Sequence, residues 1–209
     1  MLHLNTIDDT VNDLLTKLTS SDYLNQFALA GGTSLALQMG HRKSIDIDLF
    51  SIEDVNMNEI SLLLENDFEK ITIRRTTPAF IFCFINSVKC DFVKHTAQKL
   101  INPCFIQEGI RLYSIEDIAA MKLNAICGRG GKKDFYDIFS LLQIFTLKEL
   151  MHFYDTKFQS DNSWMALRSM QYFEDADTQE VPELIKSFPE WPKIKKFLIE
   201  SVNDFKFDA

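Results

Sequence analysis

The first third of the chain alternates between helix-like and strand-like patterns of hydrophobic positions. Residues 6–19 carry apolar side chains at helical spacing with acids near the start, which predicts an amphipathic helix. The short apolar run 27–30 predicts a strand that leads into a pair of glycines. Residues 33–39 have the composition of a short helix, and Gly40 is placed to end it.

Residues 45–49 alternate strictly between apolar and acidic side chains, the period of a half-buried strand. Ile45, Ile47 and Leu49 are expected to pack inward. A helix is predicted next, at residues 58–65. Three strands follow at residues 69–75, 79–85 and 88–93, with a tight turn at Asn86-Ser87 between the last two.

From Ser114 onward the pattern becomes helical. Ser114 and Asp117 resemble a capping box with Asp in place of Glu, at the start of a helix that runs to about Cys127. The glycines of residues 128–131 interrupt it. Further helices are predicted at residues 133–144, 147–158, 162–173 and 191–205. The expected fold class is therefore α/β (α+β), with an α/β lobe over residues 1–110 and a helical lobe over residues 111–209.

Composition restricts the partners. The content of 46% hydrophobic residues in 209 suffices for a substantial core. A net charge of −8 does not favour a broad nucleic-acid-binding surface, so a polynucleotide would need a local basic patch. A nucleotide needs only a few cations, and the overall charge does not argue against one.

The chain carries no stretch of about 20 apolar residues and no basic leader at its start, so a cytoplasmic protein without a membrane span is expected. The four cysteines form no C-x-x-C pair and are expected to be reduced thiols: Cys83, Cys90, Cys104 and Cys127.

The densest chemical signal is a glycine pair followed by two aspartates. Asp46 and Asp48 share one face of the predicted strand, where two adjacent carboxylates repel unless a cation neutralises them. Such a pair suits Mg²⁺, which binds a few carboxylates together with phosphate oxygens. Gly31 and Gly32 would let backbone N–H groups approach a phosphate, at the positive end of the following helix. The alternative is a solvated acidic edge strand after an ordinary glycine turn.

Asp91 lies in another apolar strand and is the candidate third carboxylate, which would bind a metal ion or orient the attacking hydroxyl. Taken alone, such an acid is more often an ordinary surface or hairpin residue.

Several residues of the helical half are candidates for binding phosphate. Lys122 interrupts an apolar helical stripe, so its ammonium either reaches solvent or points at a nucleotide. Arg129, Lys132 and Lys133 form a compact basic cluster, which a solvated helix start would also explain.

Two further sets of residues have a functional and an ordinary interpretation. Asp134 and Asp137 are neighbours on a helix, either in the site or as acids that complement the helix dipole. In the loop before Asp46, His41 is a candidate ligand or base that could simply be exposed, and Arg42 is a candidate phosphate or RNA contact.

Together these motifs resemble the AbiEii/AbiGii family of nucleotidyltransferase-like toxins, within the DNA polymerase β-like superfamily. The matching segments are residues 30–35, 41–50, 117–125 and 132–138. Lys133 departs from the pattern, because the family more often carries Arg there; lysine keeps the charge but gives up bidentate phosphate binding.

The resemblance implies a polymerase β-like mixed sheet with flanking helices, followed by a helical lobe. It implies that Asp46 and Asp48 bind Mg²⁺ and that Thr33 or Ser34 contacts the triphosphate. Lys122 would also hold phosphate, and Asp134 or Asp137 would assist. Family members are typically toxins of two-gene toxin–antitoxin systems, and some transfer nucleotides to the tRNA 3′ end. NTP, tRNA and a cognate antitoxin are therefore the expected partners.

Three functions remain open on the sequence. The first is a Mg²⁺-dependent transferase that moves a nucleoside monophosphate from an NTP to an acceptor hydroxyl. The second is a non-catalytic nucleotide-binding module that regulates a partner. The third is a small-molecule adenylyltransferase.

Overall fold

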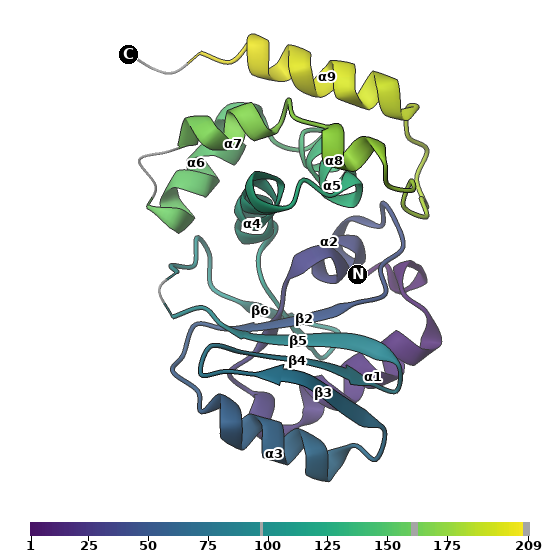
Figure 1. Ribbon diagram of the computed structural model, residues 1–209, viewed down its shortest axis with the longest axis vertical. Helices are drawn as coiled ribbons and strands as arrows, with labels where there is room; N and C mark the ends of the chain where they lie inside the picture. Colours follow the sequence, from purple (N-terminus) through teal and green to yellow (C-terminus); the bar gives the residue numbers. More distant parts are fainter. Residues whose placement is uncertain (97, 160–162, 207–209) are drawn as a thin grey trace.

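The computed structural model describes residues 1–96, 98–159 and 163–206, and it divides into a sheet half and a helical half (Figure 1). The seven-stranded mixed sheet has the order β3-β4-β5-β2-β1-β7-β6. Its strands are β1 (Ala28–Leu29), β2 (Ile47–Ser51), β3 (Ile71–Thr76), β4 (Phe80–Ile85), β5 (Val88–Lys94), β6 (Phe105–Gln107) and β7 (Ile110–Leu112).

The pairs β2/β5 and β1/β7 are parallel, and the other neighbouring strands are antiparallel. The mixed sheet with flanking helices confirms the predicted fold class. The helices are α1 (Asp9–Ser20), α2 (Gly31–Met39), α3 (Met57–Asp67), α4 (Ile115–Gly128), α5 (Lys132–Leu141), α6 (Leu147–Phe158), α7 (Ser163–Ser169), α8 (Glu174–Asp177) and α9 (Trp191–Asn203). None of the helices in the described part of the chain combines the length and the hydrophobicity needed to cross a bilayer.

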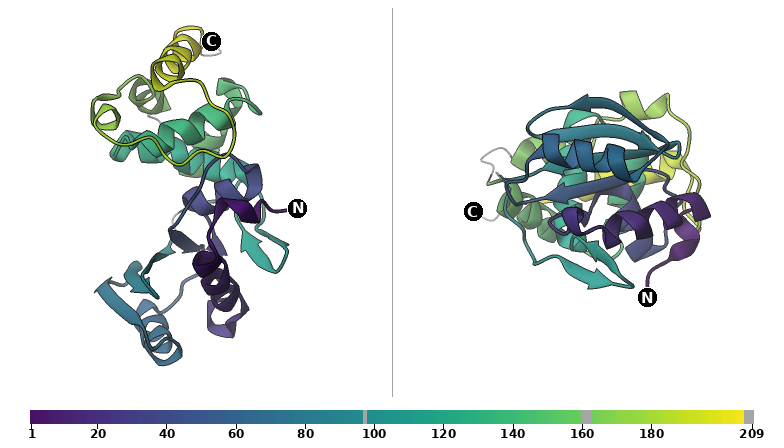
Figure 2. Two further views of the ribbon diagram at one scale, coloured as in Figure 1. Left: turned by 90° about the vertical axis from the view of Figure 1, so that its right-hand side faces the viewer. Right: turned by 90° about the horizontal axis from the view of Figure 1, so that it is seen from below.

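Two hydrophobic cores lie on opposite sides of the central strands. One joins α1 and α3 to the sheet, and the other is formed mainly by the helices from α4 onward. Helix α2 lies between the sheet and the helical half (Figures 1 and 2). It contributes Leu37 to the first core and Leu35 to the second, so it connects the two halves.

Local signals in the sequence account for many of the boundaries. Helix α6 has the predicted bounds and begins with a complete capping box between Thr146 and Glu149. Gly40 ends α2 in the left-handed conformation, with φ 66°. Asn86 and Ser87 have φ of 51° and 69°, as a two-residue hairpin turn requires.

One expected side-chain position was wrong, and some elements were not predicted. Ile45 was expected to pack inward but is 67% exposed, because β2 begins only at Ile47. The β6–β7 hairpin and the short helix α8 were not predicted at all. The predicted helix start at Asn162 lies outside the described residues. Strand β7 spans the predicted lobe boundary at residue 110, and the division into two lobes stays a prediction.

Candidate functional site

Three aspartates lie on one side of the parallel strand pair at the centre of the sheet. Asp48 of β2 is in register with Asp91 of β5, and Asp46 lies just before β2. Burial raises the pKa of Asp48 above its ordinary value, and the charges of Asp91 and Asp46 raise it further. Lys89 and Lys122 only partly offset this. The fold therefore holds the desolvated Asp48 carboxylate next to two other acids that repel it, and a cation would stabilise this arrangement.

Lysines contact Asp46 and Asp91, the two carboxylates on either side of Asp48. Lys133 Nζ lies 3.5 Å from Asp46 Oδ2, and Lys89 Nζ contacts Asp91 Oδ2. Burial alone would lower the pKa of Lys89, but its bond to Asp91 reverses this, so the pKa is raised. Asp91 Oδ1 is buried and has no hydrogen-bond partner among the described residues.

Within residues 1–96, 98–159 and 163–206, no group of three or more His, Cys, Asp or Glu side chains is arranged to hold a metal ion. The donor chemistry nevertheless fits a hard divalent cation. All three acids offer carboxylate oxygens, and the unpartnered Asp91 Oδ1 is an oxygen that a cation could use.

The glycine pair forms the first turn of α2 and lies against this acidic group. Gly31 has φ +65°, and a Cβ there would lie 2.4 Å from Asp48 Oδ2. A Cβ on Gly32 would lie 2.7 Å from Arg42 Nη2. Only glycine lets the backbone come this close. Ala30, the N-cap, has no side chain that could accept from the first-turn N–H groups, so these donors remain for a ligand.

Thr33 and Ser34 are fully buried in α2. Thr33 Oγ1 donates to the Asp46 carbonyl oxygen and lies 2.8 Å from Ser44 Oγ. Ser34 Oγ accepts from Gln38 Nε2 at 3.1 Å. The Thr33 hydroxyl thus fixes the loop that carries Asp46 against α2.

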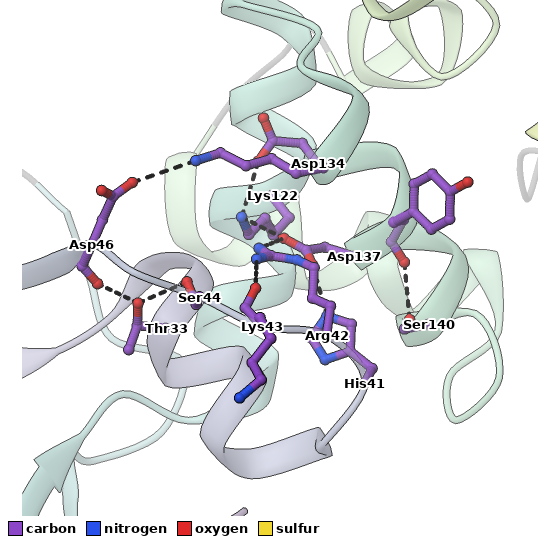
Figure 3. Close-up of polar contacts among 12 residues, drawn as sticks. Thr33, His41, Arg42, Lys43, Ser44, Asp46, Lys122, Asp134, Asp137 and Ser140 are labelled. Atoms are coloured by element: carbon purple, nitrogen blue, oxygen red, sulfur yellow. Dashed lines mark hydrogen bonds and ion pairs between the residues drawn. The ribbon is translucent and has the colours of Figure 1, made fainter. Parts of the chain in front are cut away.

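Asp137 of α5 is the centre of a buried ion-pair cluster with side chains from α4 and from the loop after α2 (Figure 3). Its Oδ1 accepts from Arg42 Nε at 2.7 Å and its Oδ2 from Arg42 Nη2 at 2.8 Å. His41 Nε2 and Lys122 Nζ lie 2.7 and 2.6 Å from its oxygens. Burial alone would raise the pKa of Asp137, but Arg42 and Lys122 hold it well below its usual value. Asp137 is therefore a fixed anion that positions three basic side chains.

Asp134 holds two cations, one of which, Lys122, it shares with Asp137. It accepts from Lys122 Nζ at 2.9 Å and from Arg129 Nε at 2.8 Å. Lys122 is only 3% exposed, so the interpretation that it reaches solvent is wrong. The Arg129 side chain is 61% exposed, which leaves part of its guanidinium open.

A cavity of about 390 Å³ lies between the glycine turn and α4. Its charged end is lined by Gly31, Gly32, Asp48, Lys122 and Arg129. Its other end is mainly apolar and is lined by residues that include Phe50, His95, Met121, Asn124, Ala125 and Phe158. The cavity thus combines a region suited to phosphate with a region suited to a flat, largely apolar group.

The comparison with protein families gives one decisive match. The model of the family described as "Nucleotidyl transferase AbiEii toxin, Type IV TA system" matches residues 13–209. The chain belongs to this family.

This AbiEii-family protein is also similar to one curated protein in sequence and to solved structures in fold. The chain is 32% identical to "Uncharacterized protein aq_aa25" of Aquifex aeolicus (strain VF5), covering 92% of this chain and 94% of that protein. Its fold is similar to "MenT4, nucleotidyltransferase toxin Rv2826c" from Mycobacterium tuberculosis H37Rv, with TM-score 0.61, 15% identity, and coverage of 95% of this chain and 83% of that one. It is also similar to JHP933 from Helicobacter pylori, with TM-score 0.51, 17% identity, and coverage of 96% and 89%.

Membership makes this AbiEii-family protein a nucleotidyltransferase and confirms the resemblance read from the sequence. Nucleotidyltransferases generally use a divalent metal ion. The type IV toxin–antitoxin system in the family description suggests an antitoxin as partner and an NTP as substrate.

The structure brings most of the predicted residues together around one cavity and its supporting cluster. Sequence reasoning missed Lys89, Phe50 and His95. Lys89 lies two residues before Asp91 on the same strand face, and Phe50 lies two residues after Asp48 on the same strand face. The period of two could have found both. His95 follows the end of β5, where only the pairing of β5 with β2 shows its place.

Proposed function

We propose that the chain transfers a nucleoside monophosphate from an NTP to an acceptor hydroxyl in a Mg²⁺-dependent reaction. The observation that carries this proposal is the close approach of Gly31 to Asp48, which sets an uncapped helix start beside the three carboxylates. Phosphate oxygens and a metal ion are the two ligands that such a junction suits.

Asp46, Asp48 and Asp91 are the proposed metal ligands. Mg²⁺ bound there would offset the charge on the phosphoryl oxygens. Lys133 and Lys89, which contact the two outer carboxylates, are flexible side chains that can leave these oxygens when the ion and the triphosphate arrive.

The triphosphate is proposed to lie at the charged end of the cavity. The N–H groups of residues 31–33, which have no acceptor within the helix, open toward it. Lys122 and Arg129 line the same end, and Asp134 holds both of them in place. Burial alone would lower the pKa of Lys122, but Asp137 and Asp134 raise it, so this lysine remains a cation at neutral pH. Arg42, directly behind Gly32, adds positive charge. Asp134 and Asp137 are positioning residues in this scheme.

In the transfer step the acceptor oxygen forms a bond to the α-phosphorus, and the bond between that phosphorus and the bridging oxygen to the β-phosphate breaks. Pyrophosphate leaves with the electron pair of that bond. Asp91 would orient the acceptor hydroxyl and take its proton through the carboxylate oxygen that does not bind the metal ion.

The tRNA 3′ end is the first acceptor to test, because the family resemblance described above includes transfer to it. A cognate antitoxin encoded with this chain is the proposed protein partner, as the family description suggests.

The test is label transfer from each α-phosphate-labelled NTP to total RNA and total protein with Mg²⁺. Asp48→Asn keeps the shape of the side chain but removes its charge. Asp54→Asn is the matched control, because Asp54 is a surface acid that follows the same strand and is 85% exposed. Label in the tRNA fraction that disappears only in Asp48→Asn supports the proposal. A folded wild type that binds NTP but labels no RNA or protein would instead favour the nucleotide-binding module or a small-molecule acceptor.

A further inference from the structure

The apolar end of the cavity contains a histidine with an unused ring nitrogen. The rings of His95 and Phe50 meet edge to face, with centroids 4.9 Å apart and planes at 63°. His95 Nδ1 is buried, and no group in the described part of the chain hydrogen-bonds to it. A buried polar atom without a partner costs free energy, and a ligand that bonds to it would recover that cost.

Strand geometry places this histidine further along the strand direction than the carboxylates. Asp48 and Phe50 are two residues apart on β2 and share a face, as do Asp91 and Val93 on β5. His95 continues the β5 face just past the strand end. Two residues along a strand span about 6.5 Å. A nucleotide whose phosphates lie at Asp48 would therefore extend its nucleoside toward Phe50 and His95, at the carboxyl ends of the parallel strands.

The charge state of His95 suits the binding of a nucleobase better than the binding of a phosphate group. Burial, with a further contribution from Lys157, lowers the pKa of His95 to about 4. At neutral pH the ring is uncharged, with one N–H donor and one acceptor nitrogen. Nucleobase edges present donors and acceptors in patterns that differ between bases, and such a ring can distinguish them.

The surrounding side chains suit a flat heterocycle. Met121, Ala125 and Phe158 supply apolar surface, and Asn124 is a second neutral polar group in the lining. Pockets of this kind bind through apolar faces and gain specificity from a few polar atoms.

We propose that this end of the cavity binds the base of the NTP, and that His95 is a specificity-determining residue that hydrogen-bonds the base edge through Nδ1. The inference rests on the proposed function, which supplies the triphosphate at the other end of the cavity.

The test measures binding without turnover. Calorimetric titrations with Mg²⁺ compare α,β-methylene analogues of the four NTPs with inorganic tripolyphosphate, which has no base. We expect the wild type to prefer one analogue. His95→Phe should weaken that analogue about tenfold and bring the four bases to similar affinities, with tripolyphosphate binding unchanged. His95→Asn, whose amide can stand near the Nδ1 position, should recover part of the preference.

His152→Phe is the matched control, since His152 is exposed on α6 and lies outside the cavity lining. A folded His95→Phe protein that keeps the wild-type preference and affinities would overturn the inference. Equal weakening of the analogue and of tripolyphosphate would overturn it too, because His95 would then act on the phosphate end. A folded wild type that binds neither the analogues nor tripolyphosphate would instead refute the proposed function itself.

Discussion

The position of Asp48 suits metal binding and lowers the stability of the metal-free protein. Its carboxylate is desolvated and lies near two other acids, so removing its charge should stabilise the metal-free protein. We expect Asp48→Asn to raise Tm by about 2–4 °C for each kcal/mol gained. Scanning calorimetry in EDTA at pH 7.5 measures this. Mg²⁺ should then raise the Tm of the wild type but not of the variant. A variant less stable than the wild type in EDTA would show that Asp48 has a structural role instead.

Asp137, in contrast, stabilises the folded protein. Replacing it with Asn leaves buried Arg42 and Lys122 without their main partner, which should cost about 3–5 kcal/mol in urea unfolding at pH 7. Asp54→Asn, which removes an exposed acid, should leave the unfolding midpoint unchanged.

The pKa of Asp137 also predicts how its contribution depends on pH. Because the folded pKa lies well below the ordinary value, the stabilisation is complete above about pH 4, the pKa expected in the unfolded chain. It is lost as pH falls from there through the folded pKa. The stability gap between wild type and Asp137→Asn should therefore be constant from pH 5 to 7 and should narrow below about pH 4. A gap that narrows already between pH 7 and 5 would mean that another group titrates in the cluster.

At the residue scale, the sequence found the candidate side chains that lie together better than it predicted their contacts. The glycine pair and the acids could be found because their spacing is local. The contact of Lys122 with Asp134 and Asp137 could not, because it depends on how α4 packs against α5. An isolated lysine on an apolar stripe fits solvent exposure as well as burial.

At the scale of elements, the start of α2 leaves no room for a side chain at Gly31. In Gly31→Ala the new methyl group would meet Asp48 and the residue would keep a positive φ, whereas in Gly109→Ala it would meet nothing within 4 Å at φ +81°. Both substitutions should cost about 1–2 kcal/mol for the left-handed backbone. Gly31→Ala should cost more in total and should abolish the Mg²⁺-dependent rise in Tm. Equal destabilisation of the two variants, with the Mg²⁺ effect retained, would show that α2 can move away from Asp48.

The elements that the sequence did not predict are those that depend on distant partners. Strands β6 and β7 have three residues each, too few for a period of two to stand out. Strand β7 is fixed by its pairing with β1, far away along the chain. Ile45 fits the alternating pattern but precedes the strand, because the loop at Ser44 is bonded to Thr6 and Thr33. Helices such as α6 were predicted well, because their caps and apolar faces are local.

At the scale of the whole molecule, buried contacts join the sheet half to the helical half in addition to the cavity that they line together. Ala28 and Ala30 from the sheet half pack in the helical core. Arg42 from the loop before β2 bonds Asp137 of α5. The loop after α2 also pairs with the segment before α9, where Ile185 N donates to the His41 carbonyl oxygen at 3.0 Å. The predicted lobes are thus joined by buried groups on both sides.

These shared contacts predict that the chain unfolds as one cooperative unit. Trp164 and Trp191, the two tryptophans of the chain, both lie in the helical half, so fluorescence reports that half alone. Hydrogen exchange of the β4 and β5 amides reports the sheet. We expect both probes to give the same urea midpoint, because opening one half would expose Ala28, Ala30 and the Arg42–Asp137 pair of the other. Arg42→Lys, which keeps the charge but gives up the bidentate bond, should lower both midpoints together. Two separate midpoints in the wild type would mean that the lobes are independent units, and that the cavity between them can open without unfolding either one.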